Sequence, residues 1–357
     1  MKFNLANQDK QKLTRLIEQR EFNIYMSDLI NDFINSPNRY LKGVNPEDMF
    51  EEFYKRLDVD PEYEDYFKKH YFPNGIYKLD DALYKDNRYF KNVRIDNIKF
   101  QKYTLGLETY KPQEVFIADD FKIIDDDYYL ELPKLGYFEN VHKFLAIKEN
   151  KVIWMSITPA ETDTMIEHIK EMHGDIITFG LGLCYFQYMA ALKDDVTTVT
   201  VVERDPNIIE LFKTHILPNF GEVAKKIIII HDDAYNQMTK FDKYDCVYVD
   251  LWHNPNDGIK FYWDFKKIEH LFPHTEFYYW LEDGIIALIR RCAITLIQEQ
   301  FIDHLNDSYY VSGKDCEVTD LIINGLYKQL KNKEFNSYDE IFSLLSMTSL
   351  IELLKLI

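Results

Sequence analysis

The stretch DIITFGLGLCYFQYMAALKDDVTTVTVVERD, at positions 175–205, decides the fold of this chain. It holds an apolar run, the turn Gly180-Leu181-Gly182, a segment with helical spacing, and a second apolar run that ends in Glu203. Two parallel strands need a crossover helix, and glycines in the first turn let backbone N–H groups approach a ligand at the helix N-terminus. Glu203 follows the glycines by about 20 residues, the spacing at which an acid accepts hydrogen bonds from ribose hydroxyls. The stretch therefore predicts a strand, a turn, a helix and a strand around a nucleoside-containing cofactor.

Further apolar runs at 227–230, 246–249 and 277–281 are expected to be strands of the same sheet. The β-branched run at 227–230 is typical of a strand that is buried on both faces. Each run is followed by acidic residues, including Asp233 and Asp250. Strands that alternate with helical segments predict a doubly wound, mostly parallel α/β sheet whose site lies along the carboxyl ends of the strands.

Two helices of this region have recognisable start signals. Thr158 and Glu161 have the spacing of a capping box, so a helix is expected at 159–173. Asp205 followed by Pro206 is a typical N-cap and first helical residue, and predicts a second helix up to residue 216.

The rest of the chain is expected to divide by its patterning. Residues 1–92 show helical spacing, with Asn45-Pro46 and Asp60-Pro61 as helix starts. Short apolar runs separated by acidic turns at 93–155 predict a small antiparallel sheet. The α/β core takes residues 156–283, and a C-terminal helical extension takes residues 284–357. Two capping boxes support that extension, one at Ser337 with Glu340 and one at Ser349 with Glu352.

Composition narrows the class of protein. The chain has 357 residues, of which 46% are apolar and 15% aromatic, enough for a sizeable core. A net charge of −18 argues against a nucleic-acid or anionic-membrane partner, because such binding draws on clustered Lys and Arg. No secretory signal and no membrane span are expected. The four cysteines lack metal-ligand spacing and are expected to be reduced thiols of a cytoplasmic protein; they are Cys184, Cys246, Cys292 and Cys316.

These residues resemble the class I S-adenosylmethionine (AdoMet)-dependent methyltransferases, including their spermidine-synthase-like relatives, over about a third of the chain. The resemblance implies a Rossmann-like core in which Gly180 and Gly182 pack on the methionine part of AdoMet and Glu203 holds the ribose. It also implies that Asp233-Ala234 faces the adenine and that Asp250 lies next to the transferred group.

The sequence also departs from that family. Thr178 stands where an acid is common, and Cys184 stands where a third glycine is common. The antiparallel strand pair that usually ends the family's core is replaced by segments with helical patterning. The replacement of that strand pair puts the substrate class in question.

The segment DLWHNPNDG, positions 250–258, is the best candidate for chemistry. It concentrates two carboxylates, Asp250 and Asp257, with the imidazole of His253 at the end of a strand. An acid or a histidine here is expected to deprotonate an attacking amine or hydroxyl, and Trp252 to stack on a planar or cationic substrate group. The alternative is that these side chains only cap the next helix. No metal is predicted.

The sequence is compatible with several functions. The first is an enzyme that transfers a methyl group from AdoMet to an unidentified small molecule, with an amine favoured by the acidic composition. Alternatives are a spermidine-synthase-like aminopropyltransferase and a non-catalytic module that binds a nucleoside and assembles, as a homo-oligomer, through its helical ends. A nicotinamide oxidoreductase is a weaker option because Tyr185 replaces the third glycine of that fingerprint.

Overall fold

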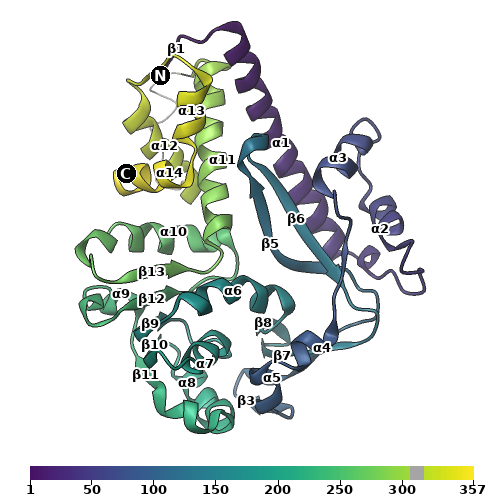
Figure 1. Cartoon of the computed structure of the whole chain (residues 1–357), viewed down its shortest axis with the longest axis vertical. Helices are drawn as coiled ribbons and strands as arrows, with labels where there is room; N and C mark the ends of the chain where they lie inside the picture. The colour runs from purple at the N-terminus through teal and green to yellow at the C-terminus, as the bar shows by residue number, and fades with distance from the viewer. Residues whose placement is uncertain (306–316) are drawn as a thin grey trace.

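The computed structural model describes residues 1–305 and 317–357, so Cys316 lies outside the described residues. Over these residues the chain is a mixed α/β protein with a five-stranded parallel sheet, three smaller sheets and a helical part (Figure 1). Across the described ranges, no helix is both long and apolar enough to cross a membrane.

The parallel sheet has five strands in the order β11-β10-β9-β12-β13. From β9 the chain adds β10 and β11 on one side of the sheet and then β12 and β13 on the other. This change of direction leaves a crevice beyond the carboxyl ends of β9 and β12. Phe179 at the end of β9 pairs with both Val202 and Val249, so the three central strands end at one level. The predicted parallel α/β sheet is thereby confirmed. Its strands are β9 (Gly174–Phe179), β10 (Val196–Glu203), β11 (Ile227–His231), β12 (Cys246–Val249) and β13 (Glu276–Tyr279).

Helices cover both faces of the central strands. Successive side chains of a strand point to opposite faces, so neighbouring residues of β9 contact different helices. Thr178 accepts a hydrogen bond from Gln187 of α7 (Tyr185–Ala191). The next residue, Phe179, packs edge-on against Phe265 of α10 (Pro255–Lys266), with ring centroids 5.2 Å apart. The sheet is therefore buried between α7 on one side and α10 on the other.

Strand β11 differs from its expected environment. It pairs only with β10 and forms one edge of the sheet. None of the four isoleucines is fully buried, and Ile228 is 46% exposed. The β-branched run thus predicted the strand correctly, but the prediction of burial on both faces was wrong because the strand's place in the sheet is set by topology.

The helix starts are confirmed in part. Thr158 caps α6 (Pro159–Glu171), but Glu161 does not return the bond of a capping box. Ser337 caps α13 as expected, whereas α14 is capped by Ser346 rather than by Ser349. The remaining helices of the core are α8 (Pro206–Leu211), which continues into a π-helical turn (Phe212–Ile216), a 3₁₀ segment (Leu217–Lys226) and α9 (Ala234–Gln237).

Residues 93–155 form parts of two sheets rather than one meander. A four-stranded antiparallel sheet has the order β3-β4-β7-β8, and its edge strand β8 borders the core. Strands β5 and β6 form a separate arm that lies along α1 and α11 (Figure 1). The strands are β2 (Tyr77–Lys78), β3 (Ile98–Phe100), β4 (Tyr103–Tyr110), β5 (Phe116–Ile124), β6 (Leu130–Tyr137), β7 (His142–Glu149) and β8 (Val152–Ser156).

The helices of the two ends of the chain pack together. The long α1 contacts α11 and α13, and β1 pairs in parallel with β14 (Figure 1). Helices α2 and α3 begin three residues after Pro46 and Pro61, because a turn intervenes. The elements are β1 (Lys2–Phe3), α1 (Asn7–Asn35), α2 (Met49–Leu57), α3 (Glu64–Tyr71), α4 (Asp81–Lys85), α5 (Arg88–Asn92), α11 (Glu282–Phe301), α12 (Val318–Leu330), β14 (Glu334–Phe335), α13 (Tyr338–Leu344) and α14 (Met347–Lys355).

Candidate functional site

A cavity of about 570 Å³ opens at the carboxyl edge of the parallel sheet. It lies beyond the ends of β9, β10, β11 and β12, where the reversal of strand order favours a ligand site. All of the residues singled out from the sequence line it, because parallel strands end at the same edge. They are Gly180, Gly182, Glu203, Asp233, Ala234, Asp250, Trp252, His253 and Asp257.

The glycine turn is held close to the end of β12. Gly180 has a φ of +94°, and a Cβ added to it would lie 2.1 Å from the carbonyl oxygen of Asp250. The buried Gln187 donates one hydrogen bond to the Gly180 carbonyl at 2.9 Å. Gly182, with a φ of +50°, has room for a Cβ, which would be in ordinary van der Waals contact with Met155 Sδ at 3.8 Å. Gly180 is thus required by both space and conformation, and Gly182 by conformation.

Cys184 occupies the N-cap of α7 without capping it. Its φ is +60°, a left-handed conformation that glycine adopts more readily than cysteine. The side chain is buried, and burial raises the pKa of its thiol well above the ordinary value. The turn is supported instead from α5: Tyr89 Oη donates to the Leu183 carbonyl at 2.5 Å, and Asn87 donates to Tyr185 Oη at 2.8 Å.

Glu203 is fixed by backbone groups and still has capacity for a ligand. One carboxylate oxygen accepts from the N–H of Leu181 at 3.2 Å and the other from the N–H of Asp205 at 2.8 Å. Each oxygen of a carboxylate can accept two hydrogen bonds. One position on each oxygen therefore remains for a pair of hydroxyl groups, the pattern that a ribose presents.

The segment after β11 forms a polar and aromatic corner of the cavity. Asp233 caps α9 by accepting from the N–H of Tyr235 at 2.9 Å, which leaves its second oxygen for a donor in the cavity. Ala234 lines the same corner. The ring of Tyr235 stacks with Phe261 at 5.9 Å, and its hydroxyl donates to Asp264 at 2.8 Å. This corner can accept a planar amino-substituted base.

Two partly buried carboxylates, Asp250 and Glu161, face the cavity without a partner. Within residues 1–305 and 317–357, neither carboxylate has a hydrogen-bond or ion-pair partner. Burial raises the pKa of Asp250 from 3.8 to about 7. Burial, and then the charge of Asp250, raise the pKa of Glu161 from 4.5 to about 8. Such a pair can accept a proton near neutral pH and attracts a cation.

Glu161 is a site residue that the sequence did not reveal. Its spacing from Thr158 is that of a capping box, which gave the carboxylate a structural role. In the structure, the Thr158 hydroxyl accepts from the backbone N–H of Glu161 at 3.4 Å, and the Glu161 side chain lines the cavity instead. Only the fold shows this, because it places the first turn of α6 beside the end of β12.

The other side chains of the 250–258 segment have structural partners. His253 Nδ1 lies 3.2 Å from Asp257, and Asp257 with Asn254 forms a capping box at the start of α10. The Trp252 indole N–H donates to the Trp280 carbonyl at 3.1 Å. Its ring packs against Gly258, where an added Cβ would be 2.6 Å away. The segment therefore presents Asp250 unpartnered, with His253 and Asp257 paired at the exposed mouth.

A wall of the cavity comes from the second sheet. Trp154, Met155 and Ser156 of β8 line it, and the Trp154 ring stacks on Tyr103 with centroids 5.3 Å apart. The Tyr103 hydroxyl donates to Asp205 at 2.6 Å, next to the Glu203 strand end. The sequence predicted β8 only as part of the antiparallel segment at 93–155, because no motif linked that strand to the cavity.

The cavity lining is strongly acidic. Of its described residues, only Arg204 and His253 can carry positive charge. The acids are Glu161, Glu203, Asp232, Asp233, Asp250 and Asp257. The electrostatics therefore favour a ligand, or pair of ligands, with net positive charge.

Comparisons with known proteins add little to this geometry. No protein-family model matches the sequence, and no curated protein does. Among solved structures, the chain is similar to a spermidine synthase from Thermotoga maritima, with 12% sequence identity and a TM-score of 0.30. The match covers 42% of this chain and 59% of that chain, less than two thirds of the synthase.

Proposed function

We propose that this protein transfers an alkyl group from an AdoMet-type sulfonium donor to an amine. The observation that carries the proposal is the pair of unpartnered carboxylates, Asp250 and Glu161, in a cavity that also holds a glycine turn and a strand-end acid. Uncompensated carboxylates are costly to bury and mark functional positions more often than structural ones.

The donor fits the side of the cavity formed by β9, β10 and β11. Glu203 would hold the ribose hydroxyls through the two acceptor positions left on its carboxylate. Asp233 and Ala234 would face the base, and the backbone at Gly180 and Gly182 would lie along the remaining chain of the donor. When bound, the positively charged sulfur makes its neighbouring carbon electrophilic.

The acceptor fits the side formed by α6 and β12. Asp250 and Glu161 attract an ammonium group, and a raised pKa lets Asp250 take a proton from it. The nitrogen lone pair then forms a bond to the donor carbon while the carbon–sulfur bond breaks, and the sulfur leaves as a neutral thioether. The protein's part is to align the two reactants and to hold the proton.

Methyl transfer is the first form of this reaction, and aminopropyl transfer is the second. The acidic lining favours the second, because the carboxylate of AdoMet would meet Glu161 and Asp250 with Arg204 and His253 as the described cationic neighbours. A decarboxylated donor carries an ammonium group and no carboxylate, and it avoids that repulsion.

Calorimetry with AdoMet, its demethylated product, decarboxylated AdoMet and NAD tests the proposal. We expect binding of at least one member of the AdoMet series, and then turnover with a panel of primary amines. Tighter binding of the decarboxylated form would select aminopropyl transfer. No binding of the series at millimolar ligand would refute the proposal, and binding without turnover on amines or cell extract would favour a non-catalytic module.

A further inference from the structure

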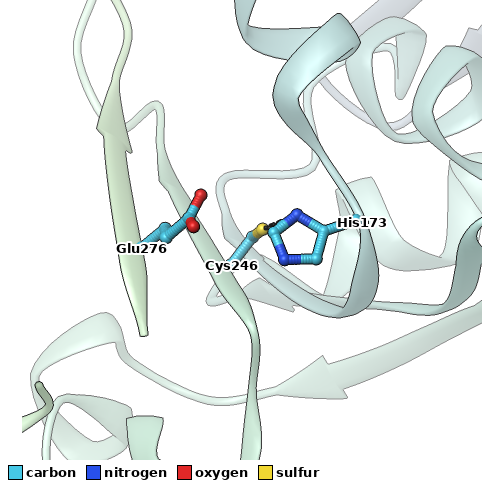
Figure 2. A group of neighbouring side chains, drawn as sticks. All are labelled: His173, Cys246 and Glu276. Atoms are coloured by element: carbon cyan, nitrogen blue, oxygen red, sulfur yellow. Dashed lines mark hydrogen bonds between the residues drawn. The ribbon is translucent and has the colours of Figure 1, made fainter. Parts of the chain in front are cut away.

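A second group of ligating side chains lies at the opposite edge of the parallel sheet from the cavity. His173 immediately precedes β9, Cys246 is the first residue of β12, and Glu276 is the first residue of β13. Cys246 and Glu276 are register partners, so their side chains point to the same face. Figure 2 shows the carboxylate of Glu276 and the imidazole of His173 on either side of the Cys246 sulfur.

The spacing of the donor atoms suits a small cation. One ligand atom from each residue lies within 4.8 Å of the other two. Cys246 Sγ is 3.4 Å from His173 Nδ1. The ligand atoms around a tetrahedral zinc ion are roughly 3.3–3.8 Å apart, as its bond lengths require. Only the partly exposed His173 and the exposed Glu276 need to move inward, and the surface leaves them room to do so.

A neighbouring group orients one of these ligands. The Tyr278 hydroxyl donates to Glu276 Oε2 at 2.7 Å. Ligating carboxylates are commonly held by an outer hydrogen bond of this kind.

We propose that His173, Cys246 and Glu276 form a zinc site with three protein ligands and one position for water. A thiolate, an imidazole and a carboxylate together select zinc over calcium and magnesium, which take oxygen ligands. Within the described ranges, this is the one group of three such side chains close enough to share an ion. The ion would join the starts of β9, β12 and β13, and it would take no part in chemistry at the other edge of the sheet.

Zn²⁺ binding would release the proton of the Cys246 thiol, since the thiolate is the form that ligates. The sequence predicted no metal role for the cysteines, because that prediction considered only close spacing. These ligands are 73 and 30 residues apart and meet only through the sheet.

Metal binding by the full chain tests the site, with Zn²⁺ in equilibrium dialysis and Co²⁺ in absorption spectroscopy. We expect one Zn²⁺ per chain and a Co²⁺ spectrum with a thiolate charge-transfer band. Cys246→Ser should abolish that band, and Glu276→Gln should weaken Zn²⁺ binding by at least about tenfold. Tyr278→Phe, which removes only the outer hydrogen bond, should weaken it by about tenfold.

Cys292→Ser is the matched control, because Cys292 is also a buried thiol but lies on α11 away from the group. It should bind both ions as the parent does. The proposal is overturned if the parent takes up no Zn²⁺, if bound Co²⁺ shows no thiolate band, or if Glu276→Gln binds Zn²⁺ as tightly as the parent. Glu276 is exposed, so its variant is informative even if Cys246→Ser does not fold.

Discussion

Asp250 and Glu161 carry the proposed chemistry at the scale of single residues. Asp250→Asn keeps the volume of the side chain but cannot accept a proton. We expect it to lower the rate of amine alkylation by about 10²–10⁴-fold while donor affinity stays nearly unchanged. Glu161→Gln should mainly raise the KM for the amine, because an amide cannot ionise to pair with the bound ammonium group. Steady-state kinetics with calorimetry in parallel measures both effects.

Two variants serve as controls for this experiment. Glu167→Gln lies on the same helix as Glu161 but is solvent-exposed, and it should leave the kinetics unchanged. His253→Gln should have a smaller effect than Asp250→Asn, because the imidazole is exposed and paired with Asp257. If turnover persists in both Asp250→Asn and His253→Gln, the proton is removed elsewhere.

Glu203 provides a test of the donor side. Glu203→Gln keeps the shape but turns an amide N–H₂ toward the backbone N–H of either Leu181 or Asp205. The loss of charge-assisted hydrogen bonds, each worth about 1.5–3 kcal/mol, should weaken donor binding by about tenfold or more. Glu210→Gln on the exposed surface of α8 is the control. A folded Glu203→Gln protein with the parent's affinity would leave the acid with a purely structural role.

The two glycines of the turn should respond differently to substitution. Gly180→Ala would place a methyl group 2.1 Å from the Asp250 carbonyl oxygen, so we expect loss of folding or a displaced β12 end. Gly182→Ala meets no atom closer than 3.8 Å and should cost about 1–2 kcal/mol through its left-handed conformation alone. Denaturant unfolding compares the two variants. Equal stability would contradict the close packing at Gly180, and unchanged donor binding by Gly182→Val would show that this glycine does not face the ligand.

The sequence was sufficient for some residues of the site and insufficient for others. Gly180, Glu203, Asp233 and Asp250 each lie at or just after the end of a strand, and the shared edge of a parallel sheet brings them together. Glu161 comes from a helix that packs beside that edge. Its position depends on the angle at which α6 meets the sheet, and residue spacing does not encode that angle.

At the scale of elements, Tyr103 of β4 links the antiparallel sheet to the segment after β10, through its hydrogen bond to Asp205. Tyr103→Phe removes the hydroxyl that binds Asp205 but keeps the ring under Trp154. We expect stability to fall by about 1.5–3 kcal/mol, the usual value for a hydrogen bond to a charged group, and donor affinity to fall with it. Denaturant unfolding and calorimetry measure the two quantities, with the exposed Tyr77→Phe as the control. A variant as stable as the parent would show that the wall is held by the ring stack alone.

The predicted boundaries of an element agree with the structure where the local sequence signals are strong. β12 has the predicted limits, because Asp245 and Asp250 bound an apolar run. Pairing between distant segments had no such signal. β1 and β14 contribute two residues each and are separated by more than 300 residues of chain, so neither could be predicted as a strand. The split of residues 93–155 into two sheets also depends on packing against α1 and α11.

At the scale of the whole molecule, the unpartnered acids should make stability depend on pH. The unfolded chain releases the protons of Asp250 and Glu161 near their ordinary pKa values of 3.8 and 4.5, whereas the folded protein keeps them until about pH 7 and 8. The folded state therefore binds more protons within that window, and stability falls as pH rises through it. Below the window, both states are protonated at these groups.

Asp250→Asn isolates this contribution. The variant should equal the parent in stability near pH 4 and exceed it by on the order of 1–3 kcal/mol near pH 9. Glu161→Gln should behave in the same way, with its gain appearing at higher pH. Thermal unfolding at a series of pH values measures the difference. A gain that does not change with pH would mean that the two carboxylates titrate normally in the folded protein.

Trp154, Trp252 and Trp280 are three of the four tryptophans in the chain, and all three line the cavity. The fourth, Trp263, lies on α10 and donates its indole N–H to the Leu354 carbonyl. Indole emission depends on local polarity and on contact with stacked or charged groups. The intrinsic tryptophan fluorescence of the protein should therefore depend on what occupies the cavity. A shift in the emission spectrum during a titration would detect a bound ligand without any label.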